Sequence, residues 1–200
     1  MTLLEILICV FLSYLIGSIP SGYLFFRWKK KKDIRNFGSQ SIGATNILRT
    51  SGWTMALPVA ALDILKGFLP TLLGLKLFAD SRLALVFGFC AVFGHCFPVF
   101  IKFRGGKGVA TAVGVYAAVA IVPLLFMLAV FMLVIVLTRY VSLGSILGAL
   151  SFPLFVSVFK ENRHILYLSI ALFLLIVFKH RSNIQRLING SERKFGDKAA

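Results

Sequence analysis

The feature that most constrains this chain is the alternation of long, nearly uncharged apolar runs with short basic loops. Hydrophobic residues make up 58% of the 200 residues and charged residues only 14%, whereas about a quarter of the residues in a soluble domain are charged. A bilayer requires such grouping, because a helix needs about 20 apolar residues to cross the hydrocarbon layer with its backbone satisfied. The sequence therefore predicts an all-α, polytopic membrane protein with a single integral membrane domain over residues 1–200.

The apolar runs form seven candidate transmembrane helices, several of them short, so those helices would stand nearly upright or thin the bilayer locally. We expect these helices at 3–26, 53–77, 82–101, 108–121, 123–138, 145–159 and 165–178. The run from Val109 to Thr138 is long for one crossing and short for two, and Pro123 near its middle is a natural break. We therefore interpret this run as a tight helical hairpin. The first run lacks the basic n-region and A-x-A cleavage site of a signal peptide, so it is kept as a helix.

The basic residues indicate the orientation of these helices. With seven spans, the inner loops 27–52, 102–107, 139–144 and 179–200 hold seven, three, one and six Lys and Arg residues. The outer segments hold only Lys76, Arg82, Lys160 and Arg163. Because Lys and Arg collect on the cytoplasmic side, the N-terminus is expected outside and the C-terminus in the cytoplasm. The same rule accounts for the net charge of +15, so nucleic-acid binding is not expected.

A polar segment rich in small residues, RNFGSQSIGATNILRT from Arg35 to Thr50, follows the first span. Its glycines let the backbone turn tightly, and successive backbone N–H groups can form a concave anion site. Arg35 and Arg49 add charges that can grip a phosphate at two points. Further side-chain donors come from Ser39, Ser41, Thr45 and Asn46. The alternative interpretation is an ordinary flexible loop, and the GxxxxGK[ST] pattern of a Walker loop is absent.

A second glycine-rich basic segment, FRGGKGVATAVG, begins at Phe103. Gly105, Gly106 and Gly108 free the backbone around Lys107. Lys107 stands at the start of the next span, where the helix dipole also attracts anions. The alternative is a positively charged membrane anchor with a glycine turn, but two such loops on one membrane face favour an anion site.

Several ionisable residues lie in or near the spans. Asp63 and Lys66 are three residues apart within the second span, so they share a helix face and can pair. Charges in a bilayer are costly and indicate function by default, although a structural pair that locks helices is equally compatible. Of the three histidines, His95 and His180 could each carry a proton or donate to phosphate. The alternative for His95 is a helix-packing hydrogen bond, and the alternative for His180, which shares a helix face with Asn183, is a snorkelling position at the membrane interface. His164 borders the outer surface and is expected to be incidental.

The motifs that the sequence lacks narrow the chemistry. No histidine has an aspartate five residues later, no G-x-S-x-G elbow occurs, and the seven acidic residues form no cluster that could hold magnesium. We therefore expect neither a metal nor a cofactor. The site is expected to bind anions with donors and cations.

The motifs GSIPSGYL, GSQSIGATN, DILKG, GHCFPVFIKFRGGKGVATAVG, SLGS and KHRSNIQRLINGSE occur in order along nearly the whole chain. This pattern resembles the bacterial acyl-phosphate:glycerol-3-phosphate acyltransferases, the PlsY family. The resemblance implies a seven-span enzyme of the bacterial inner membrane with its active site facing the cytoplasm. It would move a fatty acyl group from acyl phosphate to the 1-hydroxyl of sn-glycerol 3-phosphate, giving lysophosphatidic acid and phosphate, as the first acylation step of phospholipid synthesis.

The resemblance also implies roles for particular residues. Contacts to substrate phosphate are implied for Gly38, Ser39, Ser41, Gly43, Thr45, Asn46, Arg49, Gly106, Lys107, Gly108, Ser145, His180 and Asn183. Among these we expect Lys107, His180, Ser39 and Arg49 to act in catalysis, with no acyl-enzyme intermediate and with a substrate phosphate taking the proton. The family usually reads GSGN where this chain has Gln40 and Ser41, and this departure affects the loop geometry.

Two other classes of protein remain alternatives. A transporter or channel for an organic phosphate would use the same cationic loops, but it should show internal repeats and polar access from both sides. A structural membrane subunit would explain the hydrophobicity but not the glycine-basic loops. As an enzyme, the chain is expected to act as a monomer on acyl phosphate and glycerol 3-phosphate within the lipid bilayer, with an upstream enzyme that forms acyl phosphate as a partner.

Overall fold

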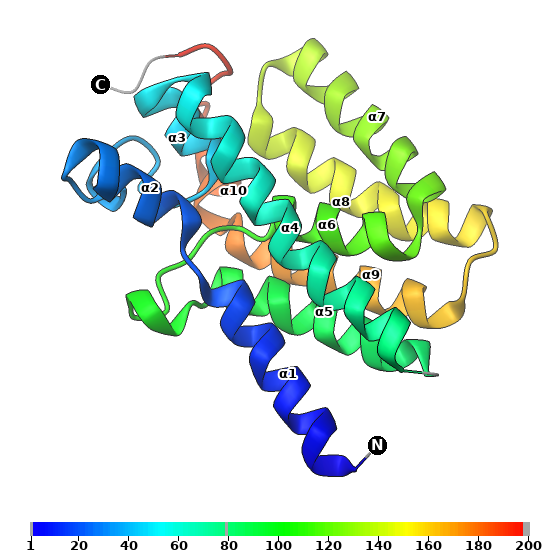
Figure 1. Ribbon diagram of the computed structural model, residues 1–200. Helices are drawn as coiled ribbons and strands as arrows, with labels where there is room; N and C mark the ends of the chain where they lie inside the picture. Colours follow the sequence, from blue (N-terminus) through cyan, green and yellow to red (C-terminus); the bar gives the residue numbers. More distant parts are fainter. Residues whose placement is uncertain (1, 79, 198–200) are drawn as a thin grey trace. The chain divides into compact units, whose positions relative to one another are not determined.

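The computed structural model describes residues 2–78 and 80–197, and within them the regular elements are all helices (Figure 1). Residues 1, 79 and 198–200 of the predicted 1–200 domain lie outside the described residues. The helices are α1 (Leu3–Ser18), α2 (Ser21–Lys30), η1 (Ile34–Asn36), α3 (Ala44–Ser51), α4 (Trp53–Leu77), α5 (Ser81–Cys96), η2 (Val99–Ile101), α6 (Val109–Val119), α7 (Ile121–Thr138), α8 (Val141–Val158), α9 (Arg163–Lys179) and α10 (Arg181–Ile188). The all-α prediction is confirmed.

Membrane-length apolar helices dominate the described part of the chain. Five segments are long and apolar enough to cross a bilayer: Leu3–Lys30, Trp53–Leu77, Ser81–Ile101, Ile121–Thr138 and Val141–Val158. The bent pair α9 and α10, which meet at 61°, would make a sixth, and α6 is a shorter apolar helix. This pattern is that of a multi-pass membrane protein.

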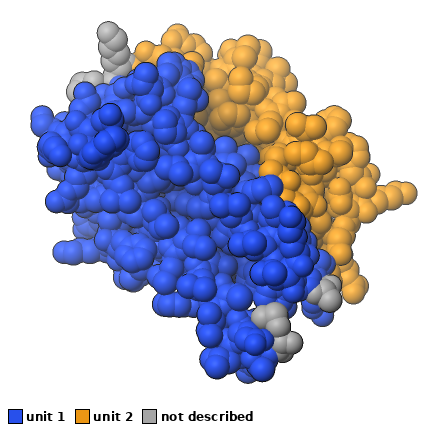
Figure 2. Space-filling model, viewed as in Figure 1, with its two compact units in different colours: residues 1–115, 198–200 blue, residues 116–197 orange. Residues whose placement is uncertain are grey.

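The chain divides into two compact units (Figure 2), and the division between residues 115 and 116 falls within α6. The described part of the first unit runs from residue 2 to 115, and the second runs from residue 116 to 197. Each unit is described separately below.

In the first unit, α1 and α4 both pack against α5 (Figure 1). Glycines allow these helix backbones to come close, as is common between membrane helices. A side chain at Gly17 would overlap the backbone of Ala91, and one at Gly94 would overlap the backbone of Tyr14. A side chain at Gly114 would likewise overlap the Ile64 carbonyl on α4. The apolar runs therefore form a tight helix bundle.

The polar segment after α2 folds onto a small hydrophobic core of its own. This core comprises Phe26, Ile34, Ile42, Ile47, Met55, Ala56, Val59 and Ile101. Ile34 and Ile47 have no exposed surface, and Ile42 has 1%. The burial of these apolar side chains holds the segment against α2, the start of α4 and η2. The loop that carries GSQSIGATN is thus a packed structure and not a flexible connection.

In the second unit, α8 packs against α7 and α9, while α10 packs against α8 and α9 (Figure 1). The Tyr116 ring stacks on the Phe152 ring with centroids 3.5 Å apart. His180 lies at the junction where the chain leaves α9 and turns into α10. The bend therefore places His180 and the first turn of α10 at one end of this unit's helices.

Several helix boundaries differ from the predicted ones. The first expected span, 3–26, is interrupted at Ile19 and Pro20, where α1 ends and α2 begins. The expected break at Pro123 is wrong: the break is at Ala120, and Pro123 sits in the first turn of α7, where its missing N–H group is not needed. The short helices α3 and α10 were not predicted, because their polar faces give no membrane-span signal.

Candidate substrate-binding loops

Asn46 organises the first glycine-rich loop, which runs from Phe37 to Gly43. Its side chain is buried, with 1% of the residue exposed. Its Oδ1 accepts from the Ser39 N–H at 2.9 Å, and its Nδ2 donates to the carbonyls of Phe37 at 3.1 Å and Ser41 at 2.8 Å. These three bonds close the loop on itself. Asn46 therefore sets the loop's shape, and its contact with phosphate stays a prediction.

The backbone of this loop is bent by two residues in the left-handed region. Gly38 has φ of 58° and Gln40 has φ of 59°. Glycine adopts this conformation freely, whereas glutamine does so at a steric cost. The Gly43 N–H is bonded to Ser41 Oγ at 3.3 Å. The amides of Ser39, Gln40 and Gly43 all make hydrogen bonds inside the loop. The loop therefore offers fewer backbone N–H groups for the concave anion site that was expected from the sequence.

Helix α3 begins directly after this loop, with Gly43 as its N-cap residue. The sequence predicted that the loop leads into the long span that begins near Trp53, but α3 comes first. Thr45 lies in the first turn of α3, and Arg49 lies in its last turn. The positive end of the α3 dipole thus lies at the loop, which favours a bound anion.

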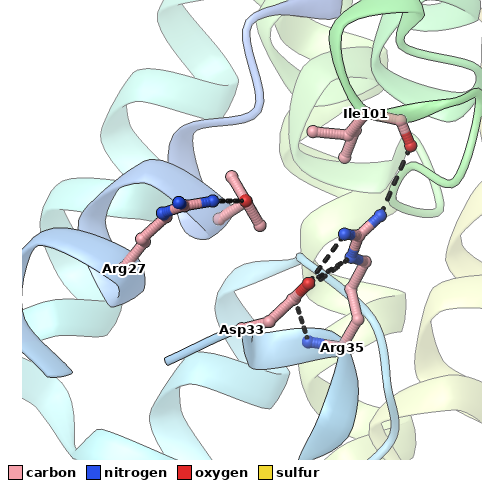
Figure 3. Close-up of polar contacts among 5 residues, drawn as sticks. Arg27, Asp33, Arg35 and Ile101 are labelled. Carbon is pink, nitrogen blue, oxygen red and sulfur yellow. Dashed lines mark hydrogen bonds and ion pairs between the residues drawn. The ribbon is translucent and has the colours of Figure 1, made fainter. Parts of the chain in front are cut away.

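Arg35, in η1 just before the first loop, ties this segment to the one that precedes the second loop (Figure 3). Its guanidinium makes a bidentate pair with Asp33, with Nη2 2.7 Å from Oδ2, and its Nη1 donates to the Ile101 carbonyl at 3.3 Å. This hydrogen-bonded pair lowers the pKa of the Asp33 carboxyl. These contacts give Arg35 a structural role between two segments of the first unit, and its expected grip on phosphate stays a prediction.

The second glycine-rich loop folds back against the end of α5. The Gly106 N–H donates to the His95 carbonyl at 3.0 Å. A side chain at Gly106 would overlap the His95 ring, and one at Gly105 would overlap the His95 carbonyl and Pro98. Glycine is therefore required at both positions for the loop to approach α5 so closely. Gly108, with φ of 84°, then turns the chain into α6, so Lys107 stands at the α6 N-terminus as predicted.

In the second unit, Glu192 gathers three side chains. Ser142 Oγ and Asn183 Nδ2 each donate to Glu192 Oε1 at 2.7 Å, and Arg186 Nε donates to Oε2 at 2.7 Å. Burial disfavours the ionised carboxylate, but these hydrogen bonds and the Arg186 charge outweigh it and lower the Glu192 pKa. The carboxylate is thus a fixed anchor for the side chain of Asn183, one of the predicted site residues.

His180 is buried, with 2% of the residue exposed, and its Nδ1 lies 2.8 Å from the Ile176 carbonyl. A carbonyl only accepts, so Nδ1 carries a hydrogen and donates to it. Ser145, one turn from the start of α8, donates to the Val141 carbonyl at 2.9 Å. The second unit therefore carries Ser145, His180 and Asn183, while the other predicted site residues belong to the first unit.

Sequence reasoning missed Glu192 as the organiser of this cluster. Its signal was present, because Glu192 is one of only seven acidic residues and ends the motif KHRSNIQRLINGSE. The contact with Ser142, 50 residues away, could not be read from the sequence. Within residues 2–78 and 80–197, no group of three His, Cys, Asp or Glu side chains is placed to hold a metal ion.

These features define a class of protein: an all-helical, multi-pass membrane protein whose first unit presents two ordered, glycine-rich loops with cationic residues. The chain belongs to the glycerol-3-phosphate acyltransferase family, which matches residues 7–190.

Relatives cover nearly the full length of this chain. It is 48% identical to the glycerol-3-phosphate acyltransferase of Thermoanaerobacter sp. (strain X514) over 187 residues, and this matched region covers 94% of each chain. It is 42% identical over 194 residues to that of Geobacter sulfurreducens, which covers 96% of this chain and 99% of the relative.

Two crystal structures of PlsY (YgiH), an integral membrane glycerol 3-phosphate acyltransferase, have the same fold. The glycerol 3-phosphate form is 42% identical with a TM-score of 0.92, and the lysophosphatidic acid form is 41% identical with a TM-score of 0.89. Both alignments cover 96% of each chain. The family resemblance stated from the sequence motifs is confirmed.

Proposed function

We propose that this chain transfers a fatty acyl group from acyl phosphate to the 1-hydroxyl of sn-glycerol 3-phosphate. The observation that carries this proposal is the pair of ordered glycine-rich loops with Arg49 and Lys107, in a fold that matches an acyltransferase in its glycerol 3-phosphate form. Arginine and lysine near helix termini suit phosphate groups. The products are lysophosphatidic acid and inorganic phosphate, and the step opens phospholipid synthesis.

The reaction needs no covalent enzyme intermediate. The 1-hydroxyl oxygen attacks the acyl carbonyl carbon, the new ester C–O bond forms, and the C–O bond to phosphate breaks. The phosphate leaves with the bonding electrons, and the hydroxyl proton passes to a phosphate oxygen. The leaving group is a good one, so the protein's main tasks are to align the two substrates and stabilise the developing negative charge.

In the first unit, Lys107 and Arg49 supply positive charge for the substrate phosphates, and Ser39 supplies a hydroxyl donor. The other residues proposed to bind phosphate there are Gly38, Ser41, Gly43, Thr45, Asn46, Gly106 and Gly108. The α3 and α6 N-termini support this role, because each follows a glycine-rich loop and favours an anion.

In the second unit, Ser145, His180 and Asn183 are proposed to contact the substrates. A role toward the glycerol hydroxyls is supported for Asn183, because its Nδ2 is held by Glu192 and, within the described part of the chain, its buried Oδ1 has no hydrogen-bond partner. An acceptor oxygen matches a hydroxyl better than it matches a phosphate oxygen.

The proposed setting is the bacterial inner membrane, with seven spans, the N-terminus outside and the C-terminus in the cytoplasm. The basic loops support this orientation through the positive-inside rule. The site would then face the cytoplasm, where a partner enzyme supplies acyl phosphate, and the chain would work as a monomer without metal or cofactor.

The test is an assay of the purified protein in detergent with palmitoyl phosphate and glycerol 3-phosphate in the presence of a chelator. We expect lysophosphatidate and phosphate in equal amounts. A parallel reaction with palmitoyl-CoA should give no product. Product from palmitoyl-CoA but none from palmitoyl phosphate would contradict the proposed donor, and activity lost to the chelator would contradict the metal-free mechanism.

A further inference from the structure

A buried ion pair lies in the middle of α4. Lys66 Nζ is 2.8 Å from Asp63 Oδ1, and 6% of Lys66 and 1% of Asp63 are exposed. A charge at this position in a membrane helix is expensive, and an apolar pair of similar size would pack the helices at lower cost. The cost of the pair leads us to look for a role beyond helix packing.

The break between α1 and α2 partly satisfies this pair. Pro20 has no N–H group, and the chain leaves α1 at Ile19, whose carbonyl accepts a 3.0 Å hydrogen bond from Lys66 Nζ. Ser21 Oγ donates to Asp63 Oδ1 from the first turn of α2. The carboxylate is thus fixed from two sides, by Lys66 on its own helix and by Ser21 on α2.

His95 occupies a third side of the Asp63 carboxylate. Its Nδ1 lies 3.5 Å from Asp63 Oδ1, and 4% of the residue is exposed. The opposite edge of the ring, at Nε2, lies where a Gly106 side chain would be. The imidazole is therefore in contact with a charged group of α4 on one edge and with the backbone next to Lys107 on the other.

We propose that Asp63 and His95 are positioning residues for the glycine–lysine loop. Asp63, balanced by Lys66, holds the imidazole in one orientation, and the imidazole supports the Gly106 backbone so that Lys107 is presented to phosphate. This inference rests on the proposed function of Lys107. The Asp63–Lys66 pair would thus affect substrate binding indirectly, because it holds the His95 ring that supports the loop.

Two variants separate positioning from packing. His95→Gln keeps an N–H donor for Asp63 but removes the flat ring beneath Gly106. The double variant Asp63→Asn/Lys66→Met removes both charges together, so no unpaired charge is left in the bilayer. The matched control is Asp80→Asn, which breaks the exposed ion pair of Asp80 with Arg82 at the start of α5.

The readouts are kcat/KM with palmitoyl phosphate and glycerol 3-phosphate, Tm in detergent, and hydrogen exchange of the segment 103–110. We expect both variants to keep Tm near that of the parent, to lose at least about tenfold in kcat/KM, since small misplacements of a binding group are costly, and to exchange faster in this segment. Asp80→Asn should match the parent in all three.

A parent-like kcat/KM in His95→Gln would overturn the role of the ring, because the only function of His95 would then be to satisfy Asp63. Faster exchange throughout α4 and α5, with the 103–110 segment no more affected than the helices, would assign the network to packing and overturn the inference as well. Lys107→Ala separates this inference from the proposed function: if Lys107→Ala remains fully active, the proposed function fails, whatever the His95 result.

Discussion

The side chain of Asn183 is held in one orientation by Glu192, through a 2.7 Å hydrogen bond from Nδ2 to Oε1. The same carboxylate accepts from Ser142 and Arg186, so its two oxygens face three donors. Within the described part of the chain, Asn183 Oδ1 is buried and has no hydrogen-bond partner. An unpaired buried acceptor is costly, and a substrate hydroxyl would satisfy it.

Glu192→Gln should weaken this arrangement. Glutamine offers one acceptor oxygen and one NH₂ group, so at least one of the donors Ser142, Asn183 and Arg186 would face a donor. We expect a loss of about 1–3 kcal/mol in stability and a marked fall in kcat. Thermal unfolding and the acyl-transfer assay measure these effects. The control is Glu161→Gln, outside this cluster, and an unchanged Tm in Glu192→Gln would contradict the anchoring role.

The protein should lose stability in acid through two carboxylates outside the spans. The Arg35 guanidinium lowers the pKa of Asp33, and the hydrogen bonds to Glu192 lower its pKa despite burial. A lowered folded pKa gives stability that is fully present above the unfolded pKa, about 4, and is lost as pH falls through the folded value. We expect Tm to hold from pH 7 to about pH 5 and to fall below about pH 4.

Asp33→Asn is the control for this pH dependence. It should start with a lower Tm at neutral pH and lose less on acidification, because one of the two titrating groups is gone. A fall in Tm on acidification as large as that of the parent would show that the Asp33–Arg35 pair does not contribute to the pH dependence of stability.

The sequence predicted those features whose residues lie close together along the chain. The Asp63–Lys66 pair was predicted because residues three apart on a helix always share a face. The position of Lys107 before α6 was predicted because the glycines and the apolar run adjoin it. The contact of Ser142 with Glu192 was not predicted, because it joins residues 50 apart that meet only after α8, α9 and α10 have packed.

The errors in the helix bounds have physical causes too. After Pro20 the sequence continues with the apolar residues Leu24, Phe25 and Phe26, so the break between α1 and α2 is hidden within one candidate membrane segment, Leu3–Lys30. In the hairpin, Pro123 was expected to mark the break, but proline is accepted in a first helical turn, so α7 begins before it at Ile121.

Gln40→Gly should stabilise the first loop. Gln40 has φ of 59°, in the left-handed region that costs a residue with a side chain about 1–2 kcal/mol. The family pattern that the sequence resembles has glycine here, so the substitution restores that pattern. We expect a gain of about 1 kcal/mol in stability, reduced by the greater freedom of glycine in the unfolded chain. Gln40→Ala, which keeps the strain, should show no gain in the same thermal unfolding measurement.

Lys107→Ala should remove most of the turnover while the fold remains. The lysine stands at the α6 N-terminus, and the glycines around it let the loop pack against His95. Loss of one charge-stabilising group costs about 10²–10³ in kcat, so we expect a fall of that size at unchanged Tm. Arg49→Ala should instead raise KM for one of the two phosphate substrates. His164→Ala, at the start of α9, is the matched histidine control and should be silent. Activity of Lys107→Ala within a few-fold of the parent, or a large loss in His164→Ala, would show that the site has been assigned to the wrong end of the helices.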